Sequence, residues 1–187
     1  MIEAELKADV RDPSRVAEQL RVWAAEERSI YRDAYYDTPD RALGRGGREL
    51  RLRTVSSATT KHLLTYKEPA VDEESQSKPE YETEVADRNA VERTLLGLGL
   101  IVDIAFEKHC RNYRFRRDGR DFLGTLVQIP EIGDSTFLEL EILVPTSAAV
   151  PAALAAIRNV FVRLDIDPDR DLNGRYYQEM VRTHRTS

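Results

Sequence analysis

The stretch IEAELKADV, residues 2–10, alternates apolar and charged side chains with a period of two. Apolar residues at the even positions are separated by Glu3, Glu5 and Lys7, a pattern that predicts a β-strand with one buried face and one charged face. The charged face either contacts water or binds a charged ligand. The charge patterns of the other predicted strands distinguish between these two possibilities.

Six further segments have the same alternation or a composition rich in β-forming residues. They are ELRLRTV (49–55), HLLTYKEP (62–69), EYETEV (80–85), KHCRNYRFR (108–116), FLGTLVQI (122–129) and TFLELEILV (136–144). Polar connectors at 56–60 and 71–79 are short, which favours antiparallel pairing of the strands that they join. We expect the second connector to be a mobile loop.

Four segments are predicted to be helical from capping residues and from apolar residues at helical spacing. They run from Asp12 to about Glu27, from Asp87 to the glycines at 97 and 99, from about Ser147 to Leu164, and from about Leu172 to Arg182. Helices combined with antiparallel strands indicate an α+β fold.

Composition limits the classes of protein to which the chain can belong. Its 187 residues are 41% hydrophobic, enough for the core of one domain spanning 1–187. The net charge of −5 argues against a general nucleic-acid binder. No run approaches the roughly 20 apolar residues of a membrane span, and the single Cys110 excludes an internal disulfide. With no signal-peptide pattern at the start, we expect a cytoplasmic protein with neither a membrane nor a nucleic-acid partner.

The charges on the predicted strands are segregated by sign. Arg51 and Arg53 share one face of their strand, Glu139 and Glu141 share another, and 80–84 carries three glutamates at alternate positions. Such faces are usually the solvent side of an antiparallel sheet. Segregation favours complementary subsites instead, because carboxylate pairs suit Mg²⁺ or Mn²⁺ and basic side chains suit phosphate. If these strands close into a barrel, the charges converge in a hydrated lumen and the apolar faces pack outward under the helices.

The segment EAELK (3–7) resembles the ExExK signature of the CYTH superfamily, the triphosphate tunnel metalloenzymes that include class IV adenylyl cyclases and thiamine triphosphatases. Further segments are similar to family motifs in the family's order and cover nearly the whole chain. They are YYDTPDRAL (35–43), LRLR (50–53), LTYKEP (64–69), KPEYETEV (78–85), EKHCRNY (107–113) and FLELE (137–141).

This resemblance implies an eight-stranded antiparallel β-barrel that forms a tunnel for a triphosphate, with helices packed outside. The metal-binding acids for Mg²⁺ or Mn²⁺ would be Glu3, Glu5, Glu139 and Glu141, which together with Lys7 form the implied catalytic set. The phosphate-binding residues would be Lys7, Arg51, Arg53, Lys67 and Lys108, and the acids with a secondary role would be Glu80 and Glu82. The implied partner is a nucleotide or another triphosphate, and a homodimer is expected.

The chain departs from the family pattern at two positions. Cys110 stands where the family commonly has the arginine of a KxR motif, and Thr125 stands where it has an aspartate. Arg111 could supply the missing phosphate-binding guanidinium only through a β-bulge, because strict alternation turns it away from the face that Lys108 and Cys110 share.

Three functions follow from these observations. The leading one is a class IV adenylyl cyclase that converts ATP to cyclic AMP and pyrophosphate. The alternative is a hydrolase of tripolyphosphate, thiamine triphosphate or a nucleoside triphosphate. The third is a catalytically weak module that binds polyanions. Outside the motifs, Arg175 is expected to be a solvated helix residue rather than a substrate contact, and Asp37 is expected to form a turn.

Overall fold

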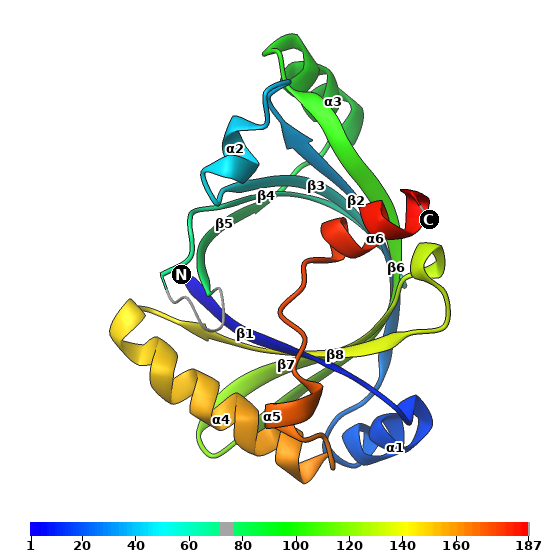
Figure 1. Cartoon of the computed structure of the whole chain (residues 1–187), viewed down its shortest axis with the longest axis vertical. Helices are drawn as coiled ribbons and strands as arrows, with labels where there is room; N and C mark the ends of the chain where they lie inside the picture. Colours follow the sequence, from blue (N-terminus) through cyan, green and yellow to red (C-terminus); the bar gives the residue numbers. More distant parts are fainter. Residues whose placement is uncertain (72–76, 187) are drawn as a thin grey trace.

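The computed structural model describes residues 1–71 and 77–186, and its strands form a closed barrel in the order β1-β5-β4-β3-β2-β6-β7-β8 (Figure 1). All neighbouring strands are antiparallel. The strands are β1 (Ile2–Asp9), β2 (Glu27–Asp37), β3 (Glu49–Ser56), β4 (Thr60–Lys67), β5 (Lys78–Glu84), β6 (Ile101–Arg117), β7 (Arg120–Gln128) and β8 (Thr136–Val144). The loop predicted at 71–79 falls mostly on 72–76, outside the described residues.

The helices pack on the outside of this barrel and at one of its openings (Figure 1). They are α1 (Pro13–Trp23), α2 (Ala42–Arg45), α3 (Arg88–Gly97), α4 (Val150–Arg163), α5 (Pro168–Asp171) and α6 (Tyr177–Thr186). Single 3₁₀ turns, η1 (Pro130–Ile132) and η2 (Ser147–Ala149), precede β8 and α4. The predicted α+β barrel is therefore confirmed.

Most of the hydrophobic core lies outside the barrel wall, between the strands and the helices, and a smaller apolar cluster that includes Phe106 and Phe137 lies on the inner side. The apolar side of β1 is buried in one cluster with residues of α1 and α4, represented by Leu6, Leu20 and Ile157. On the opposite side, Leu52 of β3 and Leu95 of α3 are buried together in a second cluster. Since the apolar faces point outward to the helices, the charged faces point into the lumen.

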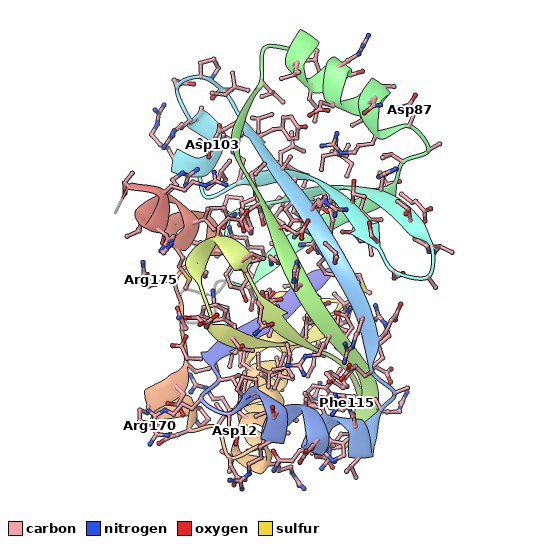
Figure 2. All side chains as sticks on the ribbon, turned by 90° about the vertical axis from the view of Figure 1, so that its right-hand side faces the viewer. Asp12, Asp87, Asp103, Phe115, Arg170 and Arg175 are labelled. Atoms are coloured by element: carbon pink, nitrogen blue, oxygen red, sulfur yellow. The ribbon has the colours of Figure 1, made fainter. Side chains whose placement is uncertain are left out.

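Asp12 and Asp87 cap the two helices that the sequence predicts them to begin. A carboxylate oxygen of Asp12 accepts a hydrogen bond from the Arg15 amide at 3.0 Å, and one of Asp87 accepts from the Ala90 amide at 3.0 Å (Figure 2). Asp37 has a comparable local role, since its carboxylate accepts backbone hydrogen bonds at the start of α2, including one from Gly44 at 2.9 Å. These caps satisfy amides that have no partner within the helix.

The residue pattern missed strand β2. The first helix was expected to reach about Glu27, but α1 ends at Trp23 and β2 begins at Glu27. The inner side of β2 carries aromatic and small polar residues, so its alternation with the outer side was not recognised. An eighth strand was expected only from the family resemblance. Strand β6 also begins at Ile101, seven residues before the predicted start at Lys108.

The last predicted helix begins later than expected. Residues 172–176 are not helical and run across an opening of the barrel, and α6 starts only at Tyr177 (Figure 1). Leu172 forms an isolated bridge with Ala8, and the amide of Asn173 donates to the carbonyl of Lys7 at 2.8 Å. Hydrogen bonds to β1 therefore replace those that would continue a helix.

Candidate functional site

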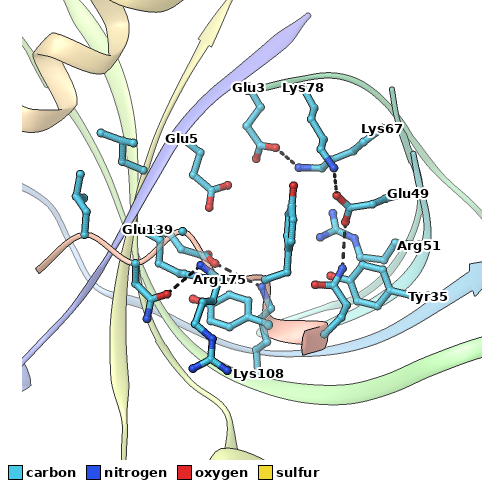
Figure 3. Close-up of a pocket in the computed structure, with 18 residues that line it drawn as sticks. Glu3, Glu5, Tyr35, Glu49, Arg51, Lys67, Lys78, Lys108, Glu139 and Arg175 are labelled. Atoms are coloured by element: carbon cyan, nitrogen blue, oxygen red, sulfur yellow. Dashed lines mark hydrogen bonds and ion pairs between the residues drawn. The ribbon is translucent and has the colours of Figure 1, made fainter. Parts of the chain in front are cut away.

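A cavity of about 180 Å³ occupies the lumen where the C-terminal segment crosses it (Figure 3). Its walls come from β1, the central strands and residues 172–178, segments that are far apart in the sequence. The charged residues that line it are Glu3, Glu5, Lys7, Glu49, Arg51, Lys67, Lys78, Lys108, Glu139 and Arg175. The structure therefore brings most of the residues implied by the motifs into one enclosed site.

The lysines of the lumen lie next to carboxylates. Lys67 pairs with Glu3 and contacts Glu80 at 2.9 Å, and Lys108 lies 3.5 Å from Glu139. The charges of Glu3 and Glu80 raise the pKa of Lys67 well above its ordinary value although burial opposes the shift. The lumen thus holds cationic groups that remain charged away from bulk water.

Some of the carboxylates lack such compensation. Burial, together with the charges of Glu139 and Glu3, raises the pKa of Glu5 to about 8. Burial and the charges of Glu3 and Glu5 raise the pKa of Glu141, the cross-strand partner of Glu5, to about 9. Glu3 differs: burial raises its pKa, but Lys67 and hydrogen bonding outweigh burial and lower it to about 2. Carboxyl groups are therefore crowded around Glu5 and Glu141, and without a cation the raised pKa values favour the neutral form of both.

These acids fit a hard divalent cation by their chemistry. Carboxylate oxygens are the ligands that Mg²⁺ and Mn²⁺ prefer, and a cation would relieve the repulsion that raises the pKa of Glu5 and Glu141. Across residues 1–71 and 77–186, however, no three acidic, histidine or cysteine side chains converge closely enough to form a ready-made metal site. A cation would need rotation of these side chains and oxygens from water or phosphate.

The two arginines of β3 have different surroundings. Arg51 lines the cavity, donates to the hydroxyl of Thr65 at 3.3 Å and lies 3.7 Å from the Glu82 carboxylate. Arg53 does not line the cavity, because Asp33 accepts two hydrogen bonds from its guanidinium at 2.6 and 2.7 Å. The ring of Tyr31 lies 4.4 Å from the same guanidinium. Arg53 is thus held in the wall rather than directed toward a ligand in this cavity.

The expectation that Arg111 could replace the missing phosphate-binding arginine is wrong in its geometry. Strand β6 pairs with β7 without a register shift from His109 to Arg117, so Arg111 lies on the outer face opposite Leu126. Cys110 is buried on the inner side, where burial raises the pKa of its thiol to about 12. The Cys110 position therefore contributes no charge to the lumen.

Thr125 lies in a neutral, hydrogen-bonded cluster on the same side of the lumen. Its hydroxyl donates to the amide oxygen of Asn112 at 3.0 Å, and the amide nitrogen of Asn112 donates to the Ser29 hydroxyl at 2.7 Å. Tyr31 donates to the same Asn112 oxygen at 3.3 Å. The two departures from the family motifs thus lie on adjacent strands, and neither adds a charge to this part of the lumen.

The C-terminal segment forms one side of the cavity. The Lys7 ammonium donates to the carbonyl of Arg175, and it lies 4.0 Å from the centre of the Tyr177 ring. The Lys108 ammonium also lies close to this ring, 4.2 Å from its centre. Arg175 was expected to be a solvated helix residue; it is exposed, but it lies before α6 and borders the cavity (Figure 3).

Several residues that line the cavity were not expected from the sequence. Glu49 pairs with Lys78 and accepts a hydrogen bond from Gln178 at 3.1 Å. Glu49 and Lys78 occupy the ends of strands whose interiors carry the motifs, so extending the alternation by one step would have found them. Tyr35 and Tyr177 also line the cavity, but they are uncharged, so the charge pattern could not identify them.

Comparison with known proteins gives a consistent assignment. Residues 1–176 match the family model described as the CYTH domain. A protein of Methanocaldococcus jannaschii named "putative adenylate cyclase" is 23% identical over 180 residues, covering 95% of this chain and 98% of the relative.

Solved structures share the fold. A protein of Pyrococcus horikoshii superposes with a TM-score of 0.81 at 24% identity, covering 97% of this chain and 99% of the other. A "putative adenylate cyclase" of Vibrio parahaemolyticus gives 0.83 at 22%, covering 97% and 98%. A protein of Hippeastrum, described as a putative adenylyl cyclase with a dominant triphosphatase activity, superposes with a TM-score of 0.70 at 17% identity, covering 98% of this chain and 96% of the other.

In the described part of this chain, no helix is long and apolar enough to cross a membrane.

Proposed function

Because the chain belongs to the CYTH domain family, we propose that it is a divalent-metal-dependent enzyme that binds a triphosphate in the lumen and converts ATP to cyclic AMP and pyrophosphate. The observation that carries this proposal is the enclosed cavity in which lysines, Arg51 and crowded carboxylates face one another. The metal-binding residues would be Glu3, Glu5, Glu139 and Glu141, and the cation would neutralise charge on the phosphoryl oxygens. Cytoplasmic location and a dimeric state remain part of the proposal.

The residues of the lumen would act by position and charge. Lys7, Lys67 and Lys108 approach the cavity from different strands, so they can contact separate phosphate groups. Among the described residues that line the cavity there is no serine, threonine, cysteine or histidine. The proposal therefore includes no covalent intermediate on one of these residue types. Instead, the ribose 3′ oxygen of ATP would attack the α-phosphate directly, and pyrophosphate would leave.

A second candidate is a triphosphatase, in which water attacks the terminal phosphoryl group. The activity described for the Hippeastrum protein favours this candidate. The cavity mouth is compatible with it, because Gly174 and Arg175 at its edge are exposed and leave water a path to a bound triphosphate.

Product analysis tests the proposal. Purified protein is incubated with ATP and Mn²⁺, and the products are separated by chromatography. Cyclic AMP with pyrophosphate supports the cyclase, ADP with phosphate supports the triphosphatase, and tight ATP binding without products indicates a polyanion-binding module.

Paired variants connect the products to the lumen. Glu5→Gln should lower turnover by about a hundredfold or more, since it removes a proposed metal ligand. Glu18→Gln changes an exposed carboxylate on α1 and should leave turnover unchanged. Equal activity of the two variants would contradict the site assignment.

A further inference from the structure

Arg111 points away from the lumen and lines a separate cavity of about 640 Å³ on the outer face of the barrel. One row of residues that line this cavity crosses four neighbouring strands through consecutive cross-strand pairs: Gln128, His109, Ile30 and Ser56. Among the described residues, none lines both this outer cavity and the cavity in the lumen. The two cavities are therefore distinct.

The outer cavity lies on a part of the barrel that no helix of the described chain covers. Figure 2 looks onto β2 and β6, with α1 near one end of these strands and α3 near the other, and no helix lies over the strands between them. The Arg28 side chain is 76% exposed, and the His109 side chain is 48% exposed. A ligand can therefore reach the outer cavity from solvent without displacing another element.

Two arginines occupy opposite positions on β2 and β6 at the outer cavity. Arg28 and Arg111 are direct cross-strand partners, and like charges in such positions repel each other. Glu26 accepts a hydrogen bond from Arg28 at 2.8 Å, but it also accepts one from Arg21 at 2.7 Å. Within residues 1–71 and 77–186, the Arg111 guanidinium has neither a hydrogen bond nor an ion pair. Positive charge therefore remains uncompensated here, although the whole chain has a net charge of −5.

Glu107, which lies on the same strand as Arg111, does not balance this charge. Its carboxylate contacts the Arg32 guanidinium at 2.9 Å and the His109 ring at 2.7 Å. Glu26 and Glu107 thus each contact two basic side chains already. An anionic ligand would supply the negative charge that these carboxylates do not provide.

The chemistry of the outer cavity suits an oxyanion of the phosphate type. A guanidinium presents planar N–H donors that bind two oxygens of a phosphate at once, and arginines on adjacent strands can approach one anion from two sides. The Ser56 hydroxyl and the Gln128 side-chain amide add hydrogen-bonding groups. The volume falls within the range of pockets for small organic ligands, so a phosphate that carries an organic group also fits.

We propose that the outer cavity binds a phosphate-type oxyanion between Arg28 and Arg111, at a site separate from the lumen. The anion would replace the repulsion between the two arginines by contacts that join β2 to β6. This inference does not depend on the proposed function, because no residue that lines the cavity in the lumen takes part. The ligand is either a free inorganic anion or the phosphate group of an organic molecule, and both present the same oxygens to the arginines.

Arginine variants test this site. Arg111→Ala removes the guanidinium that has no partner in the described chain, and Arg111→Glu places a carboxylate opposite Arg28, where the anion would bind. Arg93→Ala is the matched control, because Arg93 is an exposed residue of α3 that does not line the outer cavity. Within the described chain Arg93 also has no hydrogen bond or ion pair, so both alanine variants remove one uncompensated charge.

Equilibrium dialysis without a divalent metal counts the anions bound per chain, with inorganic phosphate and glycerol 3-phosphate as probes. We expect the unmodified protein and Arg93→Ala to bind one anion more per chain than Arg111→Glu, with a dissociation constant of about 1 mM or lower. Arg111→Ala should weaken this binding about tenfold or more, because it removes a charge-assisted contact. Equal binding of the two probes identifies the oxyanion alone as the ligand, and tighter binding of glycerol 3-phosphate identifies an organic phosphate.

Crystals soaked in tungstate, a heavy analogue of phosphate, locate the anion by anomalous scattering. We expect a tungsten peak between Arg28 and Arg111. The absence of that peak, or equal anion counts in the unmodified protein and Arg111→Glu, overturns this inference and leaves the proposed function standing. A peak between the two arginines with no anion in the lumen supports this inference and counts against the proposed function.

Discussion

The Asp33–Arg53 pair shows how individual residues of the lumen wall constrain one another. Asp33 is fully buried and accepts two hydrogen bonds from the Arg53 guanidinium. Burial raises the pKa of the Asp33 carboxyl, but Arg53 outweighs burial and holds it well below its usual range. Removing one partner of such a pair leaves the other charge buried and uncompensated.

We expect Asp33→Ala to lower the free energy of unfolding by about 3–5 kcal/mol, the cost of breaking a buried ion pair from one side. Urea denaturation measures the change. The double variant Asp33→Ala/Arg53→Leu should recover part of the loss, because it removes the stranded charge as well.

Arg116→Ala is the matched control for Asp33→Ala. Arg116 contacts Asp121 at 3.2 Å with both side chains largely exposed, so the loss should stay below about 1 kcal/mol. Similar losses for Asp33→Ala and Arg116→Ala would show that the wall does not depend on the buried pair.

The face of a strand on which a residue lies was easier to predict than whether its side chain is free to bind a ligand. Alternation alone placed Arg53 with Arg51, but it could not show that Asp33 engages Arg53, because Asp33 lies on the strand that the pattern missed. The same limit applies to Thr125, because its partner Asn112, and the Ser29 hydroxyl that accepts a hydrogen bond from Asn112, come from two other strands.

At the scale of elements, Glu26 connects α1 to the strands that follow it. Its carboxylate accepts from Arg21 at 2.7 Å on α1, from Arg28 at 2.8 Å on β2 and from the Tyr113 hydroxyl at 2.6 Å on β6. Burial raises the pKa of Glu26, but these donors outweigh it and lower the pKa to about 2. The ionised carboxylate therefore stabilises the folded chain.

This shift predicts a dependence of stability on pH. A folded-state pKa of about 2, below the ordinary value of 4.5, gives stabilisation that is present above pH 4.5 and is lost as the pH falls toward 2. Glu26→Gln should therefore be less stable than the unmodified protein at pH 7, and the difference should shrink by pH 3. Chemical denaturation at the two pH values measures the difference.

Glu27→Gln is the control for this pH dependence, because Glu27 is the exposed neighbour of Glu26 in the chain. It should differ little from the unmodified protein at either pH. A stability loss in Glu26→Gln that is as large at pH 3 as at pH 7 would contradict the role of the ionised carboxylate.

Most elements could be predicted from local signals, and the exceptions have a physical cause. The aspartate caps and the alternating strands follow from contacts near in sequence, so α3 and β8 lie close to where they were expected. The extended path of 172–176 depends on hydrogen bonds to Lys7 and Ala8, about 165 residues away in the chain. No local pattern reports such contacts.

For the whole molecule, the exchange of inside and outside is the property that connects fold to function. Apolar strand faces are buried against α1, α3 and α4, and charged faces of both signs meet in the lumen. The segregation of charge suggested this arrangement, and the family resemblance specified the number of strands. A cavity of about 390 Å³ that α2, β6 and α6 line together could not be predicted, because these elements meet only after the barrel has closed.

The most direct measurement is a crystal structure of the protein with Mn²⁺ and tripolyphosphate, in which anomalous scattering locates the metal. We predict Mn²⁺ among the carboxylates around Glu5 and Glu139, and phosphates in contact with Lys67, Lys108 and Arg51. A triphosphate bound on the outer surface, for example at the exposed Arg114 and Arg116 of β6, with an unliganded lumen would contradict it.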